Sequence, residues 1–235
     1  MTSIIIPSHN EEKNLTYLLP YLEQITKTKQ VEIIVVLSAG NKDHSNQIPF
    51  LEKTIFLKCP KNGRADQMNY GVSTSKGNKL VFLHADVKPP VDFIDNIQDT
   101  LNSDFDAGFF SYKFDKESFL LNINASFTAK DGFFTGGGDQ CLFINKDVFF
   151  ALGKFDEQQV IMEDFEFFQR MKKNNIPYKI IKNDLVVSAR KYESNSYLKV
   201  NVCNLLLVLL FKSGYPSKKL KGLHYKLLKV PYTSK

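Results

Sequence analysis

Near-continuous apolar runs, separated by segments of helical spacing, are the feature of this sequence that most constrains its fold. The clearest run is residues 31–37 (VEIIVVL), and shorter runs occupy residues 4–6, 55–57 and 79–83. Strands that are apolar on both sides need both faces of their sheet covered. Because such strands alternate here with helical segments over short links, the sequence predicts an α/β fold with a mostly parallel central sheet flanked by helices.

The predicted helices have apolar residues at three- and four-residue intervals. The first helix covers residues 11–27, with Asn10 as its expected N-cap and Pro20 as an expected kink. The other predicted helices cover residues 64–75, 91–101, 118–130 and 163–173. Later strands are predicted at residues 106–114 and 140–144, with one or two more within residues 178–188, and a flexible glycine loop is predicted at residues 135–138.

The chain is expected to divide into one main domain and a short C-terminal extension. Its 235 residues contain no internal repeat and no long linker, so residues 1–195 are expected to form one domain and residues 196–235 a helical extension. The extension contains the apolar residues 200–211, followed by the lysine-rich residues 217–229. The apolar part is shorter than the roughly 20 residues that cross a bilayer, which favours a helix packed on the core.

The positive charge of the chain is concentrated in this extension. Residues 212–235 contain seven lysines and no acidic residue, whereas the rest of the chain has 24 basic and 25 acidic residues. A polybasic segment attracts phosphates, either of lipid headgroups or of nucleic acid. Two interpretations stay open for this segment, a solvated surface helix or a helix in a membrane interface, and no nucleic acid is expected as a partner.

The cysteines and the N-terminus favour a cytoplasmic protein. Cys59, Cys141 and Cys203 are widely spaced and odd in number, which is not typical of a disulfide framework or a metal cluster and indicates a reducing compartment. Met1 leads directly into an apolar strand, without the basic and longer apolar segments of a secretory signal. The expected location is the cytoplasm, either throughout it or at the inner face of the cell membrane.

Polar residues stand after four of the predicted strands. They are Pro7-Ser8-His9-Asn10-Glu11, Ser38-Ala39-Gly40-Asn41, Gly63-Arg64-Ala65-Asp66-Gln67-Met68-Asn69 and His84-Ala85-Asp86. Ligands of open α/β sheets bind outside the carboxyl ends of the strands. These residues are therefore predicted to converge on one binding crevice.

Asp86 is the strongest single candidate for a functional residue. A carboxylate at a strand end suits a hard divalent cation, which takes carboxylates together with substrate phosphates. His84 points to the same side of the strand, where it could bind the metal, a phosphate or a ribose. The structural alternative is that Asp86 only caps the turn before Pro89 and Pro90.

Charged residues at two predicted helix starts have both a structural and a functional interpretation. Gly63-Arg64 offers free N–H groups and a guanidinium, which together favour a phosphate, although an exposed surface arginine fits the same pattern. Glu163-Asp164 opens another helix, where acidic side chains offset the helix dipole. A carboxylate at that place could also remove a proton from an attacking hydroxyl.

Several common motifs are missing from the sequence. Gly136-Gly137-Gly138-Asp139-Gln140 lacks the spacing of a dinucleotide fingerprint and precedes a predicted strand, whereas that fingerprint follows one. No Walker, HExxH or GxSxG sequence occurs. His9, His44 and His224 lie at unrelated positions and are interpreted as ordinary surface or partly buried histidines.

The order and spacing of the motifs carry more information than any one of them. The series begins with Ile4-Ile5-Ile6-Pro7, Asn10-Glu11, Gly63-Arg64-Ala65, Gln67-Met68-Asn69 and Phe82-Leu83-His84-Ala85-Asp86. It continues with Gly138-Asp139-Gln140, Gly153-Lys154-Phe155, Met162-Glu163-Asp164-Phe165-Glu166 and Ser188-Ala189-Arg190-Lys191-Tyr192. Over nearly the whole chain this series resembles the family 2 glycosyltransferases of the GT-A fold, and it is most similar to a bacterial subgroup of short, single-domain members with a Leu-His-Ala-Asp metal motif.

The resemblance implies an activity and residue roles. It implies transfer of a sugar from a nucleotide diphosphate to a hydroxyl of a lipid-linked or small acceptor, with inversion and with Mn²⁺ or Mg²⁺. Asp86 and His84 would bind the metal, and Asp164, with Glu163 beside it, would be the catalytic base. The nucleotide would contact Pro7, Asn10, Glu11, Arg64 and Asn69. The sugar or acceptor would contact Gly138, Asp139, Gln140 and Arg190.

The sequence departs from the family pattern at two positions. Leu37 stands where an aspartate usually reads the base, so the resemblance does not imply a uridine donor. His84 stands where the metal motif usually has its first aspartate. Two alternatives stay open: a non-catalytic nucleotide-sugar-binding module, and a nucleotidyltransferase, which would usually carry a Gly-rich phosphate loop after the first strand.

Overall fold

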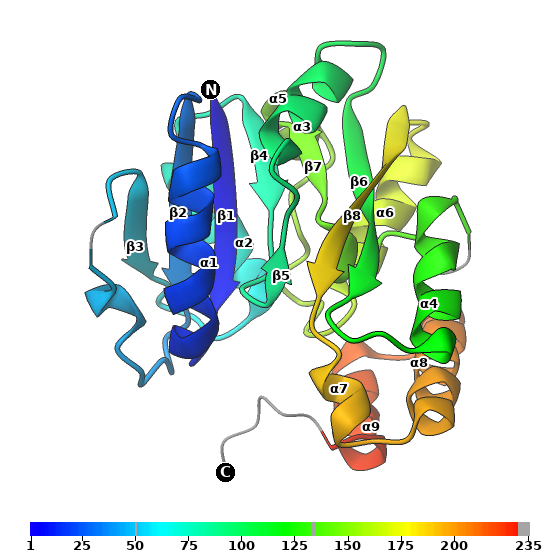
Figure 1. Ribbon diagram of the computed structural model, residues 1–235. Helices are drawn as coiled ribbons and strands as arrows, with labels where there is room; N and C mark the ends of the chain where they lie inside the picture. The colour runs from blue at the N-terminus through cyan, green and yellow to red at the C-terminus, as the bar shows by residue number, and fades with distance from the viewer. Residues whose placement is uncertain (50, 133–134, 230–235) are drawn as a thin grey trace.

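A computed structural model describes residues 1–49, 51–132 and 135–229, which form a mixed eight-stranded sheet with helices on both faces (Figure 1). The strand order is β3-β2-β1-β4-β7-β6-β8-β5. The strands are β1 (Thr2–Ser8), β2 (Val31–Leu37), β3 (Thr54–Lys58), β4 (Lys79–Phe82), β5 (Val87–Lys88), β6 (Ala107–Phe114), β7 (Phe143–Asn145) and β8 (Tyr178–Val187). The α-helices are α1 (Glu12–Ile25), α2 (Arg64–Thr74), α3 (Phe93–Leu101), α4 (Phe119–Ser126), α5 (Lys146–Ala151), α6 (Glu163–Lys173), α7 (Arg190–Glu193), α8 (Tyr197–Lys212) and α9 (Ser217–Leu227).

The first half of the sheet is parallel, as the apolar runs predict. β1 lies between β2 and β4, and β3 pairs with β2 at the outer edge. β7 then runs antiparallel to both β4 and β6, whereas β6 and β8 are parallel to each other. The predicted α/β fold, with a mostly parallel sheet and flanking helices, is confirmed.

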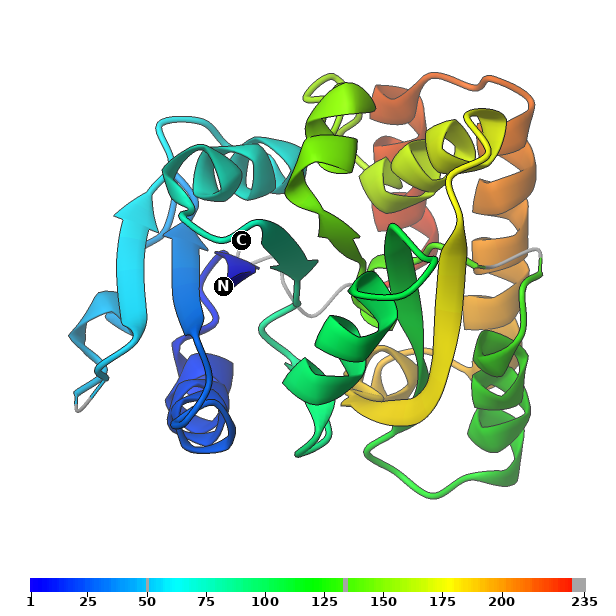
Figure 2. The ribbon, with the colours of Figure 1, turned by 90° about the horizontal axis from the view of Figure 1, so that it is seen from above.

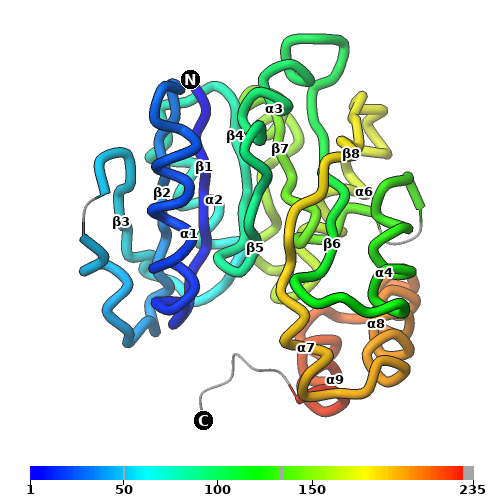
Figure 3. Tube along the Cα trace, in the orientation of Figure 1, coloured from blue at the N-terminus to red at the C-terminus, as the bar shows by residue number. Residues whose placement is uncertain are grey.

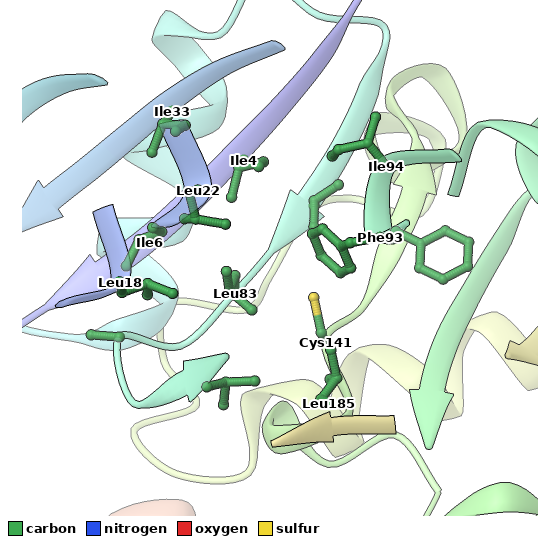
Figure 4. Close-up of a cluster of buried hydrophobic side chains, with 14 of the residues drawn as sticks. Ile4, Ile6, Leu18, Leu22, Ile33, Leu83, Phe93, Ile94, Cys141 and Leu185 are labelled. Atoms are coloured by element: carbon green, nitrogen blue, oxygen red, sulfur yellow. The ribbon is translucent and has the colours of Figure 1, made fainter. Parts of the chain in front are cut away.

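Successive residues of the central strands face two separate hydrophobic cores. Ile4 and Ile6 are fully buried in one core with side chains of α1 and α3, whereas Ile5 is fully buried in the other. Figure 2 shows α1 and α3 on one side of the sheet and α2, α5 and α6 on the other. Figure 4 shows part of the first core, in which Ile6 lies near Leu18 and Leu22 of α1. Because side chains alternate along a strand, covering both faces requires the near-continuous apolar runs.

The first helix begins differently from its prediction. Glu11 occupies the N-cap position, and Asn10 before it has a left-handed φ of 56°, which asparagine tolerates better than most residues. The prediction that Asn10 is the cap is therefore wrong. α1 continues as a helix through Pro20, whose side chain is exposed on the outer face.

Two later elements also differ from their predicted bounds. The strand predicted at residues 140–144 begins only at Phe143, because Gly138–Gln140 forms a 3-10 turn. The helix predicted at residues 118–130 ends at Ser126 and continues as a further 3-10 turn. The two-residue strand β5 was not predicted, since it exists only through its pairing with β8.

The C-terminal helices lie together beyond the carboxyl ends of β6 and β8 (Figures 1 and 3). α8 and α9 bury apolar side chains in a third hydrophobic cluster, which also includes Met162 just before α6. Within the described residues, no helix is long and apolar enough to cross a membrane.

Candidate active site

Two neighbouring cavities open at the carboxyl ends of the strands. The strand-end cavity, of about 360 Å³, lies beside the ends of β1 and β4 and the start of α2. The helix-side cavity, of about 390 Å³, lies between the Gly137–Gln140 turn, the start of α6, and helices α4 and α8. Both cavities are lined by Arg64, His84, Asp139, Ile161 and His224. Ligands in the two cavities would therefore meet at these shared residues.

An ion-pair cluster lines the strand-end cavity. Nη2 of Arg190 lies 2.9 Å from Oδ2 of Asp86 and 3.1 Å from Oε1 of Glu11. The three residues follow β4, β1 and β8, so the order of the sheet brings them together. The prediction grouped Arg190 with the sugar and acceptor residues, but the structure places it with Asp86 and Glu11, because β8 ends beside the strand-end cavity.

The end of β2 contributes no carboxylate to this cavity. Leu37 is only 7% exposed and belongs to the hydrophobic core. The buried Ser38 that follows has its Oγ 2.6 Å from Nδ1 of His9. His9 lines the strand-end cavity next to Pro7, although the sequence interpretation treated it as an ordinary histidine. A His9–Ser38 pair thus lies at the end of β2, directly after Leu37.

Arg64 stands between the two cavities. It begins α2, with Gly63 at the N-cap position, as the sequence predicts. Its guanidinium forms an ion pair with Glu163, which is 1% exposed. A buried carboxylate needs a charged partner, so this pair fixes the position of Arg64. The Arg64 side chain is nevertheless 42% exposed, which leaves part of the guanidinium accessible to a ligand.

His84 lies between Arg64 and Asp139. Its Nε2 is 3.2 Å from Nη1 of Arg64, and its Nδ1 is 3.5 Å from Oδ1 of Asp139. Both ring nitrogens thus already face protein side chains. Among the residues that the structure describes, no group of three or more His, Cys, Asp and Glu side chains could hold a metal ion. A metal at Asp86 would need further ligands from a substrate.

Glu163 and Asp164 point to different places although they are neighbours. α6 begins directly after Met162, which has a left-handed φ of 61°. Glu163 pairs with Arg64, whereas Asp164 lines the helix-side cavity. Burial, together with the negative charge of Glu163, raises the pKa of Asp164 to about 6. A carboxyl group with this pKa is suited to accept a proton near neutral pH.

Gly138 lies close to the side chains of both His84 and Asp164. A Cβ atom at this position would be 2.4 Å from Cε1 of His84 and 2.5 Å from Oδ2 of Asp164. Both distances are shorter than real Cβ contacts. The Gly138–Gln140 turn therefore approaches the two side chains closely only because residue 138 has no side chain.

Helices α4, α7 and α8 form the outer wall of the helix-side cavity. Asn124 of α4 donates to Oδ1 of Asn201 at 2.9 Å and accepts from the Tyr197 hydroxyl at 2.8 Å. Lys191 donates to Oδ1 of Asn204 at 2.9 Å. This wall was not predicted from the sequence. The sequence does contain an indication of a polar wall, because asparagines interrupt the otherwise mostly apolar helices α4 and α8.

The C-terminal helix α9 reaches both cavities. His224 lines the two of them, and Lys221 and Tyr225 line the strand-end cavity. Burial, with the positive charges of Lys191 and Arg64, lowers the pKa of His224 to about 4. The sequence interpretation of His224 as an ordinary histidine missed this position, because only packing brings the end of the chain back to the strands.

Two residues predicted to bind the nucleotide line neither cavity. The side-chain oxygen of Asn10 accepts from the backbone N–H of Lys42. Asn69 is 7% exposed, and its amide both donates to the carbonyl and accepts from the N–H of Phe155. Asn10 thus connects two loops and Asn69 connects α2 to the backbone of Phe155, so the structure does not place either side chain at the cavities with the other predicted nucleotide residues.

The remaining predicted residues lie at the cavities. Pro7 and Glu11 line the strand-end cavity, and Gly138 and Asp139 line the helix-side cavity. Gln140 also lines the helix-side cavity, but its amide group bonds the N–H of Gly136 and the carbonyl of Thr128. Its side chain therefore supports the glycine loop.

A sequence model described as glycosyl transferase family 2 matches residues 3–173. The chain belongs to this family. The match ends with the last residue of α6, so the C-terminal helices that close the cavities lie beyond it. This finding confirms the resemblance to family 2 and identifies the protein as a glycosyltransferase. No curated protein sequence matches the chain significantly.

Solved glycosyltransferase structures share the GT-A fold of this family 2 member. S. aureus TarS superposes with a TM-score of 0.66 at 16% identity, over 96% of this chain and 42% of TarS. TarS 1–349 in complex with UDP-GlcNAc gives 0.62 at 17% identity, over 96% of this chain and 71% of the other. Mannosyltransferase PcManGT from Pyrobaculum calidifontis, in complex with GDP-Man and Mn²⁺, gives 0.62 at 13% identity, over 96% and 69%. This chain thus spans less than half of TarS, and identities this low show the fold alone.

Proposed function

We propose that this glycosyltransferase moves a sugar from a nucleotide diphosphate to an acceptor hydroxyl in one inverting displacement, with a divalent metal. The observation that carries the proposal is the Asp164 carboxyl, with a pKa of about 6, in a cavity that adjoins a second cavity. A donor in the strand-end cavity and an acceptor in the helix-side cavity would meet next to Asp164. This separation gives the two substrates of a transfer reaction distinct sites.

The strand-end cavity has the groups that a nucleotide diphosphate needs. Pro7 and Glu11 line it at the end of β1, where they would contact the nucleoside. Arg64 and Arg190 also line it, and their guanidinium groups suit a diphosphate. TarS binds UDP-GlcNAc and PcManGT binds GDP-Man, which supports a nucleotide-sugar donor here as well. The His9–Ser38 pair would contribute to the choice of base.

The residues after β4 fit a metal ion whose coordination is completed by the donor. Asp86 lines the strand-end cavity with a carboxylate, and Mg²⁺ is typically held by one or two carboxylates together with substrate phosphates. Mn²⁺ suits the same oxygen ligands, and PcManGT is in complex with Mn²⁺. When bound, the metal would neutralise charge that develops on the leaving diphosphate. Asp86 would hold it, with His84 as the adjacent second candidate.

The chemistry of this chain's own residues follows from their positions. Asp164 would take the proton of the acceptor hydroxyl as that oxygen attacks the anomeric carbon. Arg64 and the N-terminus of α2 would stabilise negative charge on the departing diphosphate. Attack from the helix-side cavity, opposite a leaving group in the strand-end cavity, would invert the configuration. Glu163 would act by positioning Arg64, with which it pairs.

The proposal includes a peripheral position at the cytoplasmic face of a membrane. α9 carries Lys218, Lys219 and Lys221, and no acidic residue occurs in this helix. A basic helix attracts the phosphates of anionic lipids. α9 also lines the cavities, so a lipid-linked acceptor would reach the site from that side.

A donor screen tests the proposal directly. Nucleotide sugars are incubated with the protein and candidate acceptors, with Mn²⁺, Mg²⁺ or a chelator, and free nucleoside diphosphate is measured. We expect metal-dependent release from at least one donor, and loss of release with the chelator. Calorimetric titration of the same donors shows whether they bind. Metal-dependent binding without diphosphate release would contradict the proposal and indicate a non-catalytic nucleotide-sugar-binding module.

The raised pKa of Asp164 predicts the pH dependence of the rate. The base must be ionised, so kcat/KM is expected to be level above pH about 6 and to fall about tenfold per pH unit below it. The pH profile of diphosphate release with a saturating donor and a subsaturating acceptor measures kcat/KM for the acceptor. An acidic limb near pH 4, the range of an unperturbed carboxyl, would assign the base to another residue.

The close approach of Gly138 gives a third test. Gly138→Ala must displace His84 or Asp164, and a displacement of about 1 Å lowers catalysis by about 10²-fold. Steady-state diphosphate release measures the effect. Gly132→Ala is the matched control, since its Cβ would lie 4.0 Å from the nearest atom, the carbonyl oxygen of Lys130. Equal rates for both variants would mean that the positions of His84 and Asp164 are not critical.

A further inference from the structure

α8 exposes a continuous apolar stripe to solvent. Successive members of the stripe are three or four residues apart, except for the adjacent pair Leu205 and Leu206, so all of them lie on one side of the helix. They are Leu198 (70% exposed), Val202 (56%), Leu205 (43%), Leu206 (39%) and Leu209 (51%). The first and last residues of the stripe are followed closely by Lys199 and Lys212.

The opposite side of α8 is also apolar and accounts for its packing. Val200, Cys203, Leu207 and Val208 are buried in the cluster shared with α9. A helix that needs only to pack on a protein core is apolar on one side and polar on the other. α8 is apolar on both sides, so its exposed stripe has no role in the described fold.

α4 adds a second apolar stripe beside the first. Its exposed residues are Phe119 (79%), Leu120 (45%) and Ile123 (39%), followed by Phe127 (66%) in the adjoining turn. The hydrogen bond between Asn124 and Asn201 connects α4 to α8. Figures 1 and 2 show both helices along the same edge of the molecule, on the far side from α1 and β3.

The part of this edge formed by α8 and the neighbouring α9 is basic, whereas the exposed Asp115 and Glu117 stand just before α4. Residues 194–229 contain seven lysines and no aspartate or glutamate. Apolar side chains next to lysines match the two layers of an anionic bilayer surface, acyl chains and phosphates.

We propose that the exposed residues of α4 and α8, here called the α4–α8 face, insert into the interfacial layer of an anionic lipid bilayer. This proposal rests on the proposed function and deepens it. Burial of apolar side chains in the bilayer would add to the electrostatic attraction between the lysines and the lipid phosphates. α8 has 16 residues and is too short to span the bilayer, so it would lie along the surface. Phe127, Asn201 and Asn204 line the helix-side cavity, so the docked face would bring the headgroup of a lipid-linked acceptor to Asp164.

Vesicle flotation of the full chain tests the proposal. The wild type is expected to float with vesicles that contain phosphatidylglycerol, and to retain part of its binding at about 1 M salt, where the Debye length is about 3 Å. The variant Val202→Gln/Leu205→Gln/Leu209→Gln removes three inserted side chains outside the cavities. Its partitioning is expected to fall by about tenfold or more, and its binding at high salt to disappear.

Two further variants separate insertion from other effects. Ile55→Gln/Val91→Gln changes exposed apolar residues away from the α4–α8 face, 45% and 73% exposed, and is expected to bind like the wild type. Lys218→Gln/Lys219→Gln/Lys226→Gln is expected to lose the salt-sensitive part of binding and keep the salt-resistant part. Binding of the α8 variant equal to that of the wild type would overturn the proposal.

Other occupants of the face would give different results. If the wild type does not bind vesicles but forms dimers, and the α8 variant does not form dimers, the face is a contact between copies of this chain and the bilayer proposal is overturned.

Diphosphate release with a water-soluble acceptor is expected to be unchanged in the α8 variant. If the wild type itself releases none from any donor, the proposed function fails independently of the vesicle result.

Discussion

Asp164→Asn is expected to lower sugar transfer by about 10²–10⁴-fold, the usual contribution of a general base. Asparagine has nearly the same shape as aspartate but cannot take the proton of the acceptor hydroxyl. The fold is expected to persist, because Asp164 is 8% exposed and its raised pKa means that burial disfavours its charge. Neutralising it should leave the melting temperature at neutral pH equal or higher.

The measurement is single-turnover transfer with a saturating donor, together with calorimetric donor binding. Donor affinity is expected to stay within a few-fold, since the loss concerns the acceptor's proton. Asp147→Asn is the matched control, because Asp147 also lies in the first turn of a helix but is exposed and outside both cavities. Wild-type transfer by Asp164→Asn would exclude this base and make Asp139, which lines both cavities, the next candidate.

Asp86→Asn is expected to abolish metal-dependent turnover with a loss of about 10²-fold or more, since it removes the negative charge that would hold the cation and its diphosphate. Arg190 would keep its contact with Glu11, so the end of β8 should stay in place. The two substitutions are expected to differ in their effect on ligand binding. Asp86→Asn should weaken donor and Mn²⁺ binding together, whereas Asp164→Asn should leave both intact.

Titration of Mn²⁺ against diphosphate release measures the second effect. Asp99→Asn, on the exposed side of α3, is the control and is expected to match the wild type. An Asp86→Asn variant with the wild-type response to Mn²⁺ would contradict the metal assignment and leave Asp86 the role of a partner of Arg190.

The elements that the sequence predicted best are those whose pattern is local. The predicted strand at residues 31–37 and the predicted helix at residues 163–173 have the bounds of β2 and α6. In both, the repeat of apolar residues covers the whole element. β5 has no pattern of its own, because two residues become a strand only through pairing with β8, about 100 positions away.

The candidate site likewise contains residues whose place could be predicted from the sequence and residues whose side-chain direction only the structure gives. Pro7, Glu11, Arg64 and Asp86 could be predicted to lie at one cavity, because each lies at the end of a strand, follows one or begins a helix at one edge of the sheet. Asn69 lies within a matching motif, yet its amide faces the backbone of Phe155. A motif specifies residue types in order, whereas the direction of a buried amide depends on which backbone groups pack against it.

The sequence by itself determined the α/β fold and the edge of the sheet where the chemistry lies, because alternation of strands and helices is a local property. It also determined the family, because the order and spacing of the motifs can be read without the structure. Only the tertiary structure decided which side chains close the site. His224 and the asparagines of α4 and α8 reach the cavities through the packing of the C-terminal helices. Tertiary structure also decided that α8 buries one apolar side and exposes the other, since apolar residues on both sides of a helix do not reveal which side finds a protein core.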